Sequence, residues 1–152
     1  MNEAVVAVSL LVAGFNLIAG VVGAIAWYTG TESASRAFWI LLRMGQGAAL
    51  TLAVAAGSLA AAGHYSDDDL FYLYALLPLA VAFVAEQLRA VSAQAVLDQR
   101  GLADASAVGD LAAGEQRAVV EAILRREIGV MATSAIVVAF LAARAAGTAH
   151  GF

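Results

Sequence analysis

Four long stretches of apolar residues dominate the chain, at about 4–28, 37–62, 70–92 and 122–147. A hydrocarbon core roughly 30 Å thick requires about 20 apolar residues in helical form. Each stretch meets that length, and polar segments separate them. The pattern therefore predicts an all-α integral membrane protein, a four-transmembrane-helix bundle in which residues 1–152 form a single domain.

The composition agrees with a membrane protein. The chain is 62% hydrophobic and 13% charged, whereas soluble domains contain about 25% charged residues. The first stretch lacks a basic start and is too long for the core of a signal peptide, so we expect it to be a retained helix. We expect a multi-pass protein of the plasma or inner membrane, with the lipid bilayer as its principal partner. Its net charge of −4 and lack of a basic stripe argue against a nucleic-acid partner.

The distribution of arginines predicts the orientation. Seven of the eight basic residues lie near the connection between the first two stretches or the connection between the last two, and Arg144 is the exception. The loop at 63–69 is acidic. Because positively charged loops stay in the cytoplasm, we expect an N-out, C-out protein with a longer cytoplasmic loop, about 93–121, between helices three and four. Asp110 is expected to cap a helix that begins near Leu111.

Small residues at helical spacing predict the faces by which the helices meet, because helices in lipid associate through close packing and hydrogen bonds. In the first stretch this face comprises Ser9, Ala13, Asn16, Gly20, Gly23 and Trp27. In the second stretch it comprises Arg43, Gly47, Leu50, Val54 and Gly57. Polar residues thus share the predicted contact faces.

Two charged residues lie within the predicted spans at similar depth. Arg43 is about 9 Å from the cytoplasmic edge of its span, and Glu86 is about 6 Å from the same edge of the next span. An unpaired charge near the bilayer centre costs about 2.5–3.5 kcal/mol on insertion scales. We therefore expect Arg43 and Glu86 to pair, with Gln46 and Asn16 extending an intramembrane polar network. In the alternative, Arg43 snorkels to the headgroups and Glu86 is interfacial.

Three further arginines are candidates for binding lipid headgroups. Arg89, Arg125 and Arg126 lie at the cytoplasmic ends of the third and fourth stretches, where basic side chains can hold an anionic lipid. The alternative is ordinary anchoring of the helix ends by positive charge.

Carboxylates and imidazoles at the outer side raise the question of a metal site. His64, Asp67, Asp69 and His150 are all expected there, and such groups bind several divalent ions. However, Ser66 followed by aspartates is typical of a helix N-cap and an acidic first turn. We therefore predict no metal site. No cofactor is predicted either, and the absence of histidine from the spans argues against haem.

Three functions fit these features. The first is a non-catalytic role through helix–helix association, as a homo-oligomer or as an accessory subunit of a larger membrane complex. The second is a homo-oligomeric channel or small transporter that uses Arg43, Gln46 and Glu86. The third is a lipid- or amphiphile-binding membrane enzyme. The lack of a recognisable catalytic motif favours the first.

Overall fold

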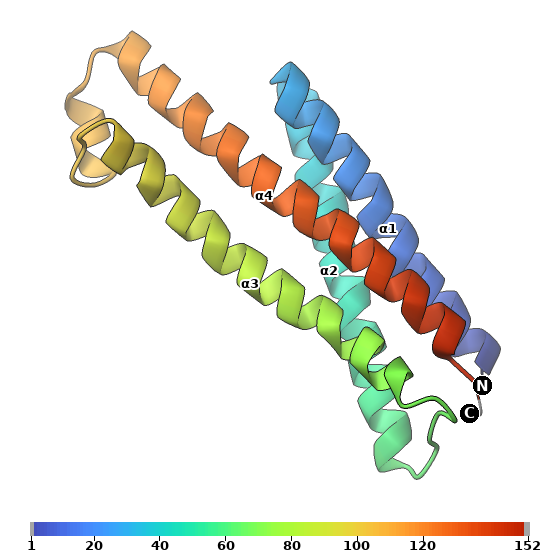
Figure 1. Ribbon diagram of the computed structural model, residues 1–152. Coiled ribbons are helices and arrows are strands. Elements are labelled where there is room, and N and C mark those ends of the chain that lie inside the picture. The colour runs from blue at the N-terminus through green and yellow to red at the C-terminus, as the bar shows by residue number, and fades with distance from the viewer. Residues whose placement is uncertain (1, 151–152) are drawn as a thin grey trace.

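The computed structural model describes residues 2–150, and the side chains of residues 3–150. Its four long helices are α1 (Asn2–Thr29), α2 (Glu32–Ala61), α3 (Leu70–Gln99) and α4 (Ala113–Thr148), and a short 3₁₀ helix, η1 (Ser106–Asp110), lies between the last two. Figure 1 shows the four long helices packed side by side as a bundle. No strand occurs within residues 2–150, as the sequence predicted.

All four long helices are long and apolar enough to cross a membrane. Their outward faces carry large apolar side chains, for example Phe83 at 66% and Phe140 at 69% exposure. In water such surfaces would form extended apolar patches, which soluble proteins avoid. The interior holds mainly smaller residues. This arrangement suits a hydrocarbon solvent, and the four helices indicate a multi-pass membrane protein.

The helices differ in how extensively they meet. α4 packs along both α1 and α3, and α1 also packs along α2. By contrast, α2 and α3 meet much less extensively. The start of α1, the end of α4 and the 62–69 loop lie at one end of the bundle, which we call the terminal end (Figure 1). The α1–α2 turn and the α3–α4 connection form the arginine-rich end. The compartment that each end faces stays a prediction.

The core has two layers. The layer toward the terminal end includes Phe71 and Leu52, and the layer toward the arginine-rich end includes Phe38 and Met131. Alanines from all four helices fill most of the remaining space. At Gly20, Gly23 and Gly45 an added Cβ would lie less than 3.0 Å from a side chain of another helix. A Cβ on Gly23 would lie 2.7 Å from the Phe38 ring, and a Cβ on Gly45 would lie 2.8 Å from the Asn16 amide.

The predicted packing face of the second helix is wrong. Leu50 and Val54 are exposed, and a Cβ on Gly47 would meet nothing within 4 Å. The buried residues of α2 are Phe38, Leu42, Gly45, Ala49, Leu52, Ala53 and Ala56. α2 turns this face toward the core, and Arg43 lies to one side of it.

The helices extend beyond the predicted spans. The predicted helix start near Leu111 agrees with α4, which begins at Ala113, but the two predicted caps do not form. α4 begins at Ala113 after an uncapped Ala112, while Asp110 ends η1. The side chain of Gln116 donates instead to the carbonyls of the preceding turn. A backbone that leaves the hydrocarbon can continue its own hydrogen bonds into the headgroup region, so apolar length sets only a minimum for helix length.

Ser66 fastens the 62–69 loop to the end of the chain. Its hydroxyl donates to the backbone carbonyls of Thr148 and His150, at 3.3 and 3.0 Å. The Asp67 amide also donates to the His150 carbonyl, at 2.9 Å. The residue that precedes α3 is Asp69, whose side chain makes no capping bond. Ser66 therefore connects the loop to the segment that follows α4 through hydrogen bonds. The prediction that Ser66 is the N-cap of α3 is wrong.

Candidate functional site

A cluster of charged and polar side chains joins α2 to α3. Arg43 Nη1 lies 2.6 Å from Glu86 Oε1 and donates to it. The same nitrogen donates to Gln46 Oε1 at 2.6 Å, and Gln46 Nε2 donates to Glu86 Oε1 at 3.3 Å. Arg43 and Gln46 occupy successive turns of α2, so both reach the same carboxylate. Three of the four residues of the predicted intramembrane network thus lie together.

Arg89 completes this cluster. Its Nε lies 3.1 Å from Glu86 Oε2, one helical turn away on α3. Its guanidinium also stacks over the Trp39 ring of α2, 5.5 Å from the centroid. From the sequence alone, Arg89 is a candidate for binding lipid headgroups. The spacing of three residues between Glu86 and Arg89 is the signal that would have indicated the pair.

Asn16 lies apart from the cluster. Its side-chain amide donates to the Val12 carbonyl at 2.9 Å, within α1. The residue is almost fully buried, and it fills the space left by Gly45 of α2. Asn16 therefore takes part in the contact between α1 and α2. The depth of Asn16 in its span predicts that it lies near Gln46. In the structure Asn16 contacts Gly45, whereas Gln46 bonds to Glu86.

The cluster is open to the surroundings of the bundle. The exposed fractions of its charged side chains are 52% for Arg43, 35% for Arg89 and 26% for Glu86. Two guanidiniums and one carboxylate leave a net charge of +1. The ion cluster, defined as Trp39, Arg43, Gln46, Glu86 and Arg89, is thus a charged seam between two helices on the outside of the bundle.

The other two headgroup candidates lie at the arginine-rich end of α4. The Arg125 guanidinium stacks over the Trp27 ring of α1, 5.1 Å from its centroid. Arg126 and Arg125 both line a concavity of about 560 Å³ that also includes Arg100 from the end of α3. The structure therefore separates Arg89 from Arg125 and Arg126, and it places Arg100 beside these two instead.

The candidate metal ligands do not come together as a site. Within residues 2–150, no group of three or more His, Asp or Glu side chains is arranged to hold a metal ion. His150 contributes its backbone carbonyl to the loop, as described above. Asp68 Oδ1 accepts from the Leu70 amide at 2.9 Å, which orders the start of α3.

One carboxylate outside the membrane-spanning helices has an altered pKa. Asp104 Oδ1 accepts hydrogen bonds from the Ser106 hydroxyl and from the Ser106 and Ala107 amides. These bonds lower the pKa of Asp104 below its ordinary value, the largest effect being that of the Ser106 hydroxyl. Asp104 thereby caps η1 in the α3–α4 connection.

Comparison with known proteins gives no relative: no family model, curated protein or solved structure matches the chain significantly.

Proposed function

We propose that this chain is a non-catalytic subunit of a larger membrane complex, and that a helix of a different protein docks over the ion cluster. The observation that carries this proposal is the open position of the cluster at the seam between α2 and α3. Helices in membranes associate through close packing and interhelical hydrogen bonds. The guanidiniums at this seam have N–H donors that remain free, so a docked helix could form interhelical hydrogen bonds there as well as pack against it.

The electrostatics favour a partner with a carboxylate. Arg43 and Arg89 share the single carboxylate of Glu86, so one positive charge is uncompensated. A guanidinium in the hydrocarbon is costly, and pairing with an opposite charge reduces that cost. A partner helix with an Asp or Glu at the same depth would neutralise the cluster. A second copy at this seam would instead add another net positive charge, so this argument favours an accessory subunit over a homo-oligomer.

A second polar side chain near the ion cluster points in a different direction from Glu86. Gln87 follows Glu86 on α3 and is exposed. Its amide makes no hydrogen bond to any part of the chain that the structure describes. In lipid, an amide without a partner costs free energy, and a polar group of a docked helix would supply one.

Site-specific photo-cross-linking in native membranes tests this proposal. A benzoylphenylalanine at Phe83, which is 66% exposed and one helical turn from Glu86, would report on the seam. One at Val21 would serve as the matched control, since Val21 lines a groove between α1 and α4. We expect Phe83 to yield a discrete adduct with a different protein, identified by mass spectrometry, and Val21 to yield none. Replacing Arg43 with Gln should reduce the adduct.

Two outcomes would refute the proposal. The first is a cross-link only to a second copy of the chain, which would indicate a homo-oligomer. The second is ion flux by the purified protein in liposomes that is lost on changing Arg43 or Glu86, which would indicate the channel or transporter.

A further inference from the structure

We propose that the α3–α4 seam binds an anionic phospholipid, with its phosphate in an arginine pocket at the arginine-rich end and an acyl chain in the apolar groove beside it. This inference goes beyond the proposed function and involves a different face of the bundle. The arginine pocket is the concavity of about 560 Å³ that contains Arg100, Arg125 and Arg126.

The three guanidiniums of this pocket lack carboxylate partners. Arg36, Arg43 and Arg89 all form ion pairs. Among the described residues, no carboxylate lies within ion-pair distance of Arg100, Arg125 or Arg126, although the chain has more acidic than basic residues. Like charges that converge without a counter-ion repel each other, and a bound anion removes that repulsion. Arginine is also the side chain best suited to phosphate, because its fork donates two parallel hydrogen bonds.

The pocket walls hold the guanidiniums in place and leave donors free. Trp27 supports Arg125 from one side, at 5.1 Å. Arg100 makes a single long hydrogen bond, of 3.5 Å, to the Ala118 carbonyl. The remaining walls include Val96 and Ala122, which are apolar. The pocket volume falls within the range of about 300–1,000 Å³ that is usual for small-molecule sites.

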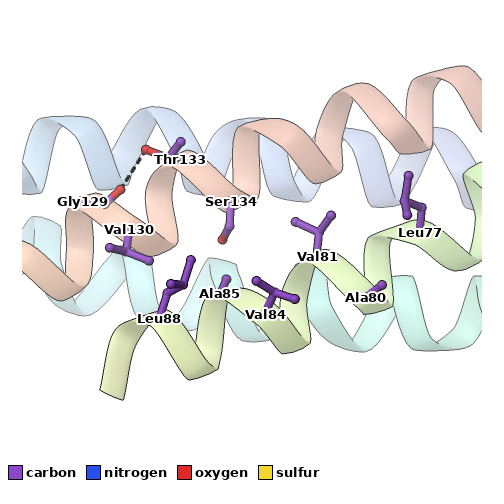
Figure 2. A pocket seen from close by; sticks show the side chains of 10 residues that line it. All are labelled: Leu77, Ala80, Val81, Val84, Ala85, Leu88, Gly129, Val130, Thr133 and Ser134. Atoms are coloured by element: carbon purple, nitrogen blue, oxygen red, sulfur yellow. Dashed lines mark hydrogen bonds between the residues drawn. The ribbon is translucent and has the colours of Figure 1, made fainter. Parts of the chain in front are cut away.

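An apolar groove lies between α3 and α4, beyond the pocket. It has a volume of about 660 Å³, and Figure 2 shows Leu88 of α3 opposite Val130 of α4, with Val81 and then Leu77 further along α3. From Leu88 to Leu77 the groove extends about 16 Å along α3, by the helical rise. Its lining is almost entirely apolar, as an acyl chain requires.

The pocket and groove follow one line along α4. On α4, Ala122 and Arg126 of the pocket precede Gly129 and Thr133 of the groove at spacings of three and four residues. Residues at such spacings share a helix face. Trp27 joins the two parts directly, because its ring lies 3.3 Å from the position that a Gly129 Cβ would occupy. A cationic pocket at the end of an apolar groove matches an anionic phospholipid better than a soluble phosphate.

Tryptophan fluorescence offers a direct test, since the chain contains only two tryptophans. With Trp39 replaced by Phe, the emission comes from Trp27 in the pocket. Phosphatidylglycerol with brominated acyl chains should quench this emission at concentrations at least about fivefold lower than brominated phosphatidylcholine, a difference of about 1 kcal/mol. Arg126→Gln and Arg100→Gln should each reduce this preference by a similar factor.

Arg117→Gln is the matched control, because Arg117 lies exposed on α4 outside the pocket and its loss removes the same charge. It should leave the preference unchanged. Equal quenching by the two lipids, or an equal loss in Arg117→Gln, would overturn the proposal. Displacement of the anionic lipid by millimolar inorganic phosphate would also overturn it, and would assign the pocket to a soluble phosphate. If Arg126→Gln does not fold, Arg100→Gln at the helix end decides the result.

Discussion

Neutralising Glu86 is the sharpest perturbation of the ion cluster. Glu86→Gln keeps the size of the side chain and removes the only carboxylate that Arg43 and Arg89 share. Two guanidiniums then remain without a counter-ion. Arg43→Gln is milder, because the pair between Glu86 and Arg89 survives. The structure therefore predicts that loss of the acid destabilises the protein more than loss of either base.

The size of the destabilisation depends on how exposed the charged side chains of the ion cluster are. Insertion scales give about 2.5–3.5 kcal/mol for a charge at the centre of a membrane helix, but partly exposed arginines can snorkel and recover much of it. Exposed ion pairs are worth about 0.2–1 kcal/mol, and hydrogen bonds between membrane helices average about 0.6 kcal/mol. For this half-exposed cluster we expect a loss in the free energy of unfolding of about 2 kcal/mol for Glu86→Gln and about 1 kcal/mol for Arg43→Gln.

The assay is reversible unfolding in mixed micelles as a double-mutant cycle. The Arg43→Gln, Glu86→Gln double variant should lose about 2 kcal/mol, which is less than its single variants lose together. Arg36→Gln is the control, because it breaks a pair whose side chains are 73% and 88% exposed. It should change stability by less than about 0.5 kcal/mol. Strict additivity of the two single variants, or a Glu86→Gln protein as stable as the wild type, would refute the reasoning.

Three further predictions concern other contacts. Gly45→Ala should destabilise the protein by about 1–3 kcal/mol because its Cβ would overlap Asn16, whereas Gly47→Ala should be neutral or stabilising; the same unfolding assay decides, and equal effects would contradict the packing. Ser66→Ala should cost about 1 kcal/mol and speed amide hydrogen exchange at the C-terminal end, while unchanged exchange would exclude a tie. NMR titration should place the folded pKa of Asp104 below its ordinary value. Its stabilisation of η1 is therefore complete above the unfolded pKa and is lost as the pH falls through the folded pKa, so an ordinary or raised pKa would contradict the cap.

The spans and the meeting of Arg43 with Glu86 were predictable from the sequence. Apolar length fixes where a helix can cross a bilayer, and the rise per residue gives the depth of each polar group. Antiparallel neighbours with opposite charges at one depth then have few other ways to be satisfied. Depth does not determine how each helix is rotated about its own axis. For this reason the predicted network wrongly included Asn16, which contacts Gly45 instead of Gln46.

The packing face of α2 shows this limit clearly. In a chain rich in alanine and glycine, small residues recur on every side of a helix, so the face with Gly47 looked as suitable as the face with Gly45. Only the neighbouring helices distinguish them, because Asn16 of α1 occupies the space beside Gly45. The caps depended in the same way on a connection whose path is set by tertiary contacts, such as that of Ser66 with the C-terminal segment.

The alanine-rich interior also shapes the temperature dependence of stability. In water, unfolding exposes apolar surface and raises the heat capacity, which curves the free energy of unfolding and leads to cold denaturation. Here the helices separate into lipid, where the buried alanines exchange one apolar environment for another. Alanine also regains no side-chain rotamers on release. We therefore expect the bundle to unfold within the bilayer with a small heat-capacity change, so that its stability falls almost linearly on heating and shows no maximum near room temperature.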